Sequence, residues 1–165
     1  MKILNTYLSL FLLIAFSGCA SVPVGNKFDN FKEPSDGKAL IYVYRPNSPP
    51  ILLKPMILID EKPISDLPNK SYFELNIRPG IYNLKADWSS LAGTSNSDFN
   101  LTAEAGKTHY IRLGSTMNIE NTFFIGGTIT PVISFDSVLN QVKIELAQKE
   151  IYQCHQILNI ESSGL

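Results

Sequence analysis

Short apolar runs separated by turn-forming residues follow one another along most of this chain. Residues 39–45 are apolar at nearly every position and rich in β-branched and aromatic side chains, which is typical of a strand buried on both faces. Residues 71–77 alternate apolar and polar side chains, and the Pro79-Gly80 turn then leads into a hairpin partner at 81–88. The predicted strands cover residues 39–45, 55–59, a short stretch at 64, 71–77, 81–88, 97–103, 108–113, 123–125 and 128–135.

The spacing of these strands defines the predicted fold class. A strand and its turn recur about every eight to twelve residues, as in all-β sandwiches. We therefore predict a mainly β fold, an antiparallel β-sandwich of about seven to nine strands. Residues 123–135 carry no charge and are interpreted as two core strands with a Gly-Gly bend. A partner-binding or membrane-touching segment is the alternative for this run.

The hydrophobic period changes near the C-terminus. Val138, Val142 and Leu146 recur at helical spacing, four residues apart on one face. The sequence therefore predicts one C-terminal α-helix over about 137–151, with its apolar stripe against the sandwich. Residues 156–165 are assigned to a tail.

The N-terminus carries a separate apolar segment. Lys2 supplies a positive charge, residues 7–16 form an uncharged run of ten, and small residues follow at 17–20. This order is the n-region, h-region and cleavage site of a secretory signal peptide, which we assign to residues 1–18. The run is about half of the ~20 apolar residues that a membrane-spanning helix needs. A buried N-terminal helix of the mature domain is the alternative.

Phe16-Ser17-Gly18-Cys19 resembles the lipobox of bacterial lipoproteins, with Phe16 in place of the usual aliphatic residue. The resemblance implies cleavage between Gly18 and Cys19, a diacylglyceryl thioether on Cys19, and acylation of the new amine, for example by palmitate. Ala20 stands where Asp would favour inner-membrane retention. The resemblance therefore implies an outer-membrane anchor facing the periplasm in a Gram-negative source. An ordinary secreted protein with a free Cys19 thiol is the alternative.

Residues 19–37 have the Pro, Gly and turn-former content of a linker. Fully extended, residues 20–37 would span roughly 60 Å at ~3.3–3.6 Å per residue. Phe28 and Phe31 are exceptions, because a free tether gains nothing from two aromatic side chains, and we expect both to dock onto the domain. The folded domain itself is assigned to residues 38–155.

Composition narrows the class of protein. The chain has 165 residues, 44% of them hydrophobic, which indicates a single globular domain. Lys plus Arg is 14 and Asp plus Glu is 15, so the formal net charge of −1 argues against nucleic-acid binding. The two cysteines cannot form a disulfide-dense scaffold. If Cys19 carries lipid, Cys154 is left alone and no intramolecular disulfide forms.

The sequence offers no convincing catalytic, metal or cofactor site. Gly106-Lys107-Thr108 lacks the rest of a phosphate-binding loop and is interpreted as a hairpin turn. His109 and Cys154 have no partners at the spacing that metal or Cys–His chemistry requires. We therefore predict no enzyme, no metal and no cofactor. The sheet aromatics Tyr42, Tyr44 and Trp88 form a candidate ligand or partner face, although aromatic side chains more often fill a sandwich core.

Three motifs carry a wider resemblance. Residues 37–46 (GKALIYVYRP), 78–80 (RPG) and 105–112 (AGKTHYIR) resemble a bacterial lipoprotein domain family of unknown function. The resemblance covers about 37–151, and it implies a fold rather than an activity. The function expected is a lipid-anchored cell-envelope protein with a structural or interaction domain that binds another envelope protein. The alternative is a periplasmic module for glycan or peptide. The oligomeric state stays open.

Overall fold

The computed structural model describes residues 24–125, 128–158 and 160. The predicted signal peptide, the cleavage site at Gly18 and the lipidation site at Cys19 lie outside the described residues. No helix in the described part of the chain is long and apolar enough to cross a membrane.

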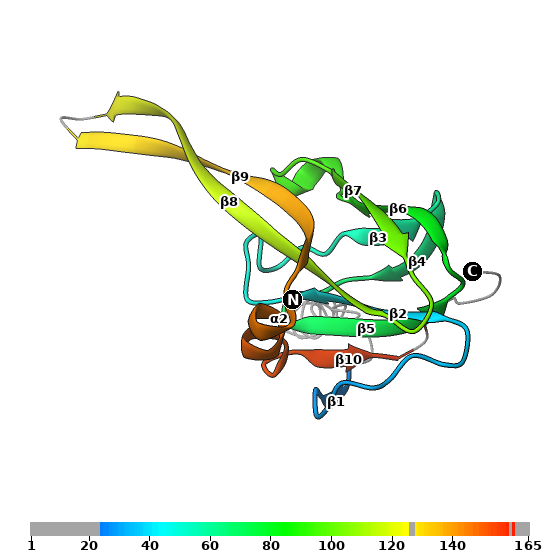
Figure 1. Ribbon diagram of the computed structural model, residues 1–165. Helices are drawn as coiled ribbons and strands as arrows, with labels where there is room; N and C mark the ends of the chain where they lie inside the picture. Colours follow the sequence, from blue (N-terminus) through cyan, green and yellow to red (C-terminus); the bar gives the residue numbers. More distant parts are fainter. Residues whose placement is uncertain (1–23, 126–127, 159, 161–165) are drawn as a thin grey trace, which may run out of the picture.

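The described residues are mainly β and form two sheets (Figure 1). Ten strands make up a six-stranded sheet of order β1-β10-β5-β2-β8-β9 and a four-stranded sheet of order β4-β3-β6-β7. The elements are β1 (Val24–Lys27), β2 (Ala39–Arg45), β3 (Met56–Ile59), β4 (Lys62–Asp66), β5 (Ser71–Ile77), β6 (Gly80–Asp87), η1 (Ser90–Ala92), β7 (Ser97–Ala103), β8 (Thr108–Ile125), β9 (Thr128–Val142), α2 (Ile144–Ile151) and β10 (His155–Ile157).

The predicted β-rich class is confirmed, but the antiparallel arrangement is wrong for the six-stranded sheet. β2 pairs parallel with β8, and β10 pairs parallel with β5. Parallel neighbours need a long connection between them. The chain between β2 and β8 supplies it, because β3, β4, β6 and β7 belong to the second sheet. The Pro79-Gly80 turn likewise joins two sheets, so β5 and β6 do not form the predicted hairpin. The turn at Gly106 (φ 73°) is also a passage between sheets, from β7 to β8.

The C-terminal helix exists but is shorter than predicted. α2 covers only Ile144–Ile151, and residues 137–142 belong to β9. Leu139 lies opposite Leu113 of β8 and is buried between the sheets, whereas Val138 is exposed. Strand pairing with β8 thus determines the conformation of residues that also fit a helical period. Part of the predicted tail is also structured, because β10 pairs with both β1 and β5.

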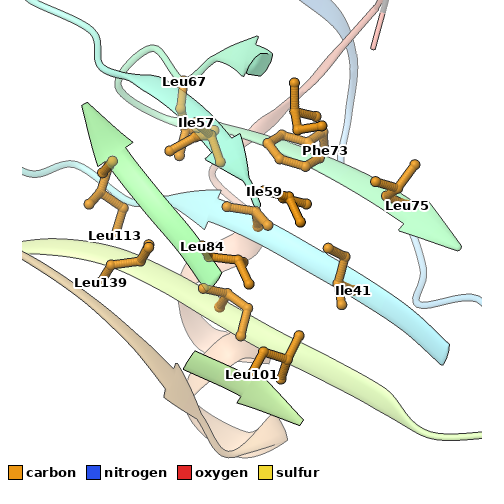
Figure 2. Close-up of a cluster of buried hydrophobic side chains, with 14 of the residues drawn as sticks. Ile41, Ile57, Ile59, Leu67, Phe73, Leu75, Leu84, Leu101, Leu113 and Leu139 are labelled. Atoms are coloured by element: carbon orange, nitrogen blue, oxygen red, sulfur yellow. The ribbon is translucent and has the colours of Figure 1, made fainter. Parts of the chain in front are cut away.

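Two hydrophobic clusters lie on opposite faces of the six-stranded sheet. The larger one fills the space between the two sheets and includes Ile41, Leu84, Leu113 and Leu139 (Figure 2). The smaller one lies on the outer face under α2 and includes Tyr42, Tyr44 and Ala147. All seven side chains of β2 are buried, so the prediction of a strand buried on both faces is confirmed.

The segment before β2 is fixed to the body over most of its described length. β1 pairs with β10, and the Phe28 ring packs edge-on against Tyr42 and Tyr72. Phe31 contacts Tyr42 and Tyr110, so the predicted docking of both phenylalanines is confirmed. The described residues 24–37 therefore do not form the free, extended linker that was predicted.

The hairpin of β8 and β9 is the most unusual element of the fold. Both strands continue past the rest of the body and project from it (Figure 1). We call residues 115–125 and 128–137 the arm. The predicted strand pair in 123–135 is confirmed, because residues 123–125 pair with residues 128–130. Its predicted place in the core is wrong, because the pair belongs to the arm that projects from the body (Figure 1).

Candidate functional site

One face of the arm is apolar and open to solvent. Met117 pairs with Phe135, and Ile119 pairs with Ile133, so these four side chains share one face of the hairpin. Met117, Ile119 and Ile133 are 59%, 64% and 48% exposed, and Phe135 is half-buried. We call these four residues the apolar arm face. Contiguous exposed apolar side chains mark interaction surfaces in soluble domains.

The opposite face of the same stretch is polar. Asn118 Nδ2 donates to Asp136 Oδ2 across the two strands at 2.6 Å. Thr116 lies directly opposite Asp136 and is exposed. The inner part of the arm is therefore an amphipathic two-stranded ribbon, with apolar residues on one face only.

An apolar loop borders the base of the arm. Residues 46–55 connect β2 to β3, and Ser48 Oγ lies 2.8 Å from Ser115 Oγ of β8. Ile51 and Leu52 of this loop are 58% and 95% exposed. The loop thus adds a second exposed apolar patch beside the arm.

A buried arginine holds this loop. Arg45 is only 1% exposed. Its Nη1 donates to the carbonyl oxygen of Leu53 at 2.8 Å, and its Nη2 donates to those of Ser48, at 2.9 Å, and Pro50. The guanidinium also lies 4.8 Å from the centre of the Trp88 ring, a favourable cation–π position. A loop fixed by so many bonds to one side chain presents its apolar residues in a defined geometry.

The predicted aromatic face of Tyr42, Tyr44 and Trp88 is not exposed. Tyr42 and Tyr44 are completely buried, and Trp88 is 8% exposed. Trp88 lies between the sheets, where its Nε1 donates to Ser137 Oγ at 3.0 Å, whereas the two tyrosines lie on the outer face of the six-stranded sheet. The three side chains therefore do not lie together on one surface.

The polar groups around the two tyrosines fix α2 to the sheet. Glu150 Oε2 accepts hydrogen bonds from Tyr44 Oη and from Arg112 Nε, each at 2.8 Å. Burial, and then the neighbouring Glu150 carboxylate, raise the pKa of the Tyr44 phenol. This triad joins α2, β2 and β8. The Glu150 carboxylate pairs with the Arg112 guanidinium, so neither charge is left without a partner.

His109 and Cys154 are buried and separate. Desolvation lowers the pKa of His109, which therefore stays neutral at pH 7, and its Nε2 accepts from the backbone N–H of Glu104 at 3.5 Å. Burial raises the pKa of Cys154 to about 12, and its Sγ donates to the Arg45 carbonyl oxygen at 3.5 Å. Among the described residues, no group of three or more His, Cys, Asp and Glu side chains could hold a metal ion.

A small polar cavity of about 240 Å³ lies beside β1 and β10. Inside it, the ammonium group of Lys32 pairs with the Glu74 carboxylate, so the two charges largely offset each other. Lys27 and Asp29 also line the cavity, so its lining has two basic and two acidic residues and no net charge. It is lined by Asn26, Lys27, Asp29, Asn30, Lys32, Tyr72, Glu74 and Gln156.

Sequence reasoning named part of the arm, residues 123–135, as a partner-binding or membrane-touching segment only as an alternative, and it missed Met117 and Ile119. Comparison with known proteins adds family membership rather than activity. Residues 35–128, which include all of β8, match the sequence model of a family described as a protein of unknown function, DUF2846. An uncharacterized protein of Haemophilus influenzae is 29% identical over 119 residues, which cover 69% of this chain and 66% of that protein. No solved structure matches the chain.

Proposed function

The chain belongs to the DUF2846 family of proteins of unknown function, and we propose that it is a lipid-anchored cell-envelope protein whose β domain serves as a structural or protein-interaction module. In this proposal the protein is held in the membrane by its N-terminal lipid, most simply in an outer membrane with the domain in the periplasm. The observation that carries the interaction role is the arm with its exposed apolar face.

The arm supports an interaction role because folding alone does not account for it. Burying a large aliphatic side chain is worth about 1.5–3 kcal/mol, yet Met117, Ile119 and Ile133 stay largely in water. The hairpin that carries these exposed side chains projects from the body (Figure 1). If a partner covers these side chains, their burial contributes that free energy to binding.

The lipobox resemblance and the short separation in sequence between Cys19 and β1 support the anchor. Only about 17 Å of extended chain, at ~3.3–3.6 Å per residue, separates Cys19 from β1. Lipid on Cys19 would hold the β1 side of the body close to the membrane surface. Two or more acyl chains would make that attachment stable, because a single chain binds membranes only marginally.

We propose no catalytic activity and no cofactor. The buried groups that could react are engaged in structural contacts: Glu150 with Tyr44 and Arg112, and Cys154 with the Arg45 carbonyl oxygen. The alternative of a glycan- or peptide-binding module loses its aromatic platform, since the three side chains on which it depended are buried. The interaction role is therefore the function that we retain.

Replacing Cys19 by alanine tests the anchor. Cells fed labelled palmitate are expected to label the wild-type protein, and Cys19→Ala is expected to lose the label and leave the membrane fraction. Cys154→Ala is the matched control and is expected to keep both, because this thiol is buried inside the body. Equal labelling of wild type and Cys19→Ala, or an unlabelled wild type, would contradict the lipid anchor.

A further inference from the structure

The polar cavity beside β1 and β10 has a floor that belongs to the six-stranded sheet. Tyr72 and Glu74 stand two residues apart on β5, so their side chains share one face of that strand. Gln156 of β10 lies directly beside Tyr72 in the parallel pairing of the two strands. All three residues line the cavity, and the strands that carry them are neighbours in the sheet (Figure 1). The hydrogen bonds of the sheet therefore fix the geometry of the floor.

The wall of the cavity is formed by β1 and the residues that follow it, which are fastened to the same face of the sheet. The backbone N–H of Phe28 donates to the Cys154 carbonyl oxygen at 2.9 Å. The Phe28 ring also lies edge-on to that of Tyr72, with 5.3 Å between the ring centres. The backbone N–H of Lys32 donates to Tyr42 Oη at 2.8 Å. Floor and wall are thus both in place before a ligand arrives, and such preorganisation favours binding.

The phenol of Tyr72 is an unused hydrogen-bonding group in this floor. Tyr72 is only 6% exposed, yet its Oη has no hydrogen bond to any residue in the described part of the chain. The oxygen is not sealed off, because the fully enclosed side-chain N and O atoms without a partner among the described residues are Thr94 Oγ1 and Ser134 Oγ. It therefore opens toward the cavity that Tyr72 lines. Buried polar groups are normally paired, so this phenol marks a place for a ligand.

Charged groups of both signs surround the phenol. Burial, then the Glu74 carboxylate and then weaker nearby charges raise the pKa of Tyr72 to about 12, so its phenol is neutral at pH 7 and can both donate and accept. The Glu74 carboxylate is already paired with the Lys32 ammonium group. Lys27 and Asp29 line the cavity as well, and neither forms an ion pair with a described residue. The cavity therefore offers one ammonium group and one carboxylate that are both unused.

We propose that this cavity binds a free amino acid, whose ammonium group lies between the Asp29 carboxylate and Tyr72 Oη and whose carboxylate faces Lys27. An ammonium group has three donors and no acceptor, and the Asp29 carboxylate and the phenol oxygen are both acceptors. The carboxylate of the ligand needs donors, which the Lys27 ammonium group and the Gln156 amide supply. This binding role goes beyond the anchor and the arm and depends on neither.

The size and composition of the cavity favour this class of ligand. Its volume of about 240 Å³ is below the ~300–1,000 Å³ of sites that hold drug-sized molecules. The eight described residues that line it contribute three amides, four charged groups and one phenol, with no aliphatic side chain among them. A ligand with a single charge would leave either Lys27 or Asp29 without a partner, and a neutral sugar would leave both. A small zwitterion pairs with each of them.

Equilibrium dialysis of the full-length chain in detergent at pH 7 tests this site. Each of the twenty standard amino acids, radiolabelled, is dialysed against the protein, and at least one is expected to be retained. Its N-acetyl derivative lacks the ammonium group and its α-amide lacks the carboxylate, so each is expected to compete at least tenfold more weakly than the unlabelled amino acid. Glucose is expected not to compete. Retention of none of the twenty, or equal competition by a derivative or by glucose, would overturn the proposal.

Two substitutions check the contacts that the proposal names. Tyr72→Phe keeps the ring but removes the hydroxyl and is expected to weaken binding at least threefold, and Asp29→Asn is expected to weaken it at least tenfold. Tyr110→Phe is the matched control, because it removes another buried phenol of the same aromatic cluster that does not line the cavity. Circular dichroism confirms an unchanged fold in each variant. Wild-type affinity in Tyr72→Phe or in Asp29→Asn, or an equal loss in Tyr110→Phe, would overturn the assignment.

The anchor and the cavity can be separated in the same assay. Cys19→Ala changes no residue that lines the cavity, so this variant is expected to retain the same amino acid with unchanged affinity. Loss of palmitate label without loss of binding supports both claims. A label that persists in Cys19→Ala contradicts the anchor and leaves the binding result to decide the cavity alone.

Discussion

Arg45→Leu is expected to lower the free energy of unfolding by about 3–5 kcal/mol, because it removes the donors of a buried hydrogen-bond network. The guanidinium is almost completely buried, and it donates to carbonyl oxygens on both sides of β3 and β4. Leucine fills part of the volume but leaves the carbonyl oxygens of Ser48, Leu53 and Leu67 without this donor. It also loses the cation–π contact with Trp88.

Urea unfolding monitored by Trp88 fluorescence measures this loss. For a domain of about 150 residues, 1 kcal/mol corresponds to roughly 2–4 °C in Tm, so Tm is expected to fall by about 6–20 °C. Arg78→Leu, at an exposed position, is the control and is expected to change stability by less than ~0.5 kcal/mol. Arg45→Lys is expected to recover only part of the loss, because an ammonium group lacks the planar fork. A change below ~1 kcal/mol in Arg45→Leu would contradict this role.

Local sequence patterns predicted the strands of this protein well where burial and turn chemistry act together. β2 and β5 have the predicted bounds, and the turn before Gly80 lies where expected. Phe28 and Phe31 were expected to dock because aromatic side chains in a free linker have no stabilising contact. These features depend on residues that are close together in the sequence, so each segment can be judged by itself.

Features that depend on distant parts of the chain could not be predicted in this way. A buried strand has the same apolar pattern whether its neighbour is parallel or antiparallel, so the pairing of β2 with β8 was not visible. Residues 137–142 fit both a helical and a strand period, and pairing with β8 decided between them. Met117 and Ile119 of the apolar arm face were missed for the same reason. The alternation at Met117 and Ile133 indicates one apolar face but not whether a second sheet covers it.

Raising the pH above about 10 is expected to unfold the domain steeply. Burial raises the pKa of four tyrosines, including Tyr72 to about 12, and raises that of Cys154 to about 12. In an unfolded chain, phenols titrate near pH 10 and thiols near 8.5. Between these values and the folded pKa values, the unfolded state has released protons that the native state retains. The affected tyrosines are Tyr42, Tyr44, Tyr72 and Tyr110.

Raising the pH therefore destabilises the fold, because the native state binds more protons than the unfolded state. Each group contributes at most ~1.4 kcal/mol per pH unit, and it reaches this maximum only where the unfolded group is ionised and the native group is not, so the combined slope steepens as the pH rises above about 10. Single domains are stable by only ~5–15 kcal/mol, so unfolding is expected between about pH 10.5 and 12. Far-ultraviolet ellipticity and tyrosinate absorbance should change together in one cooperative transition.

Removing one buried phenol tests the mechanism. Tyr72→Phe and Tyr110→Phe each remove a phenol with a raised pKa, so each is expected to reduce the pH slope of stability, by at most ~1.4 kcal/mol per unit, and to move the alkaline midpoint upward. Tyr152→Phe removes a phenol that is 52% exposed and serves as the control. Tyrosinate absorbance that rises near pH 10 while the ellipticity stays native would show that these phenols titrate in the folded state. That outcome would contradict their assignment to a dry aromatic cluster beneath α2 and the docked Phe28 segment.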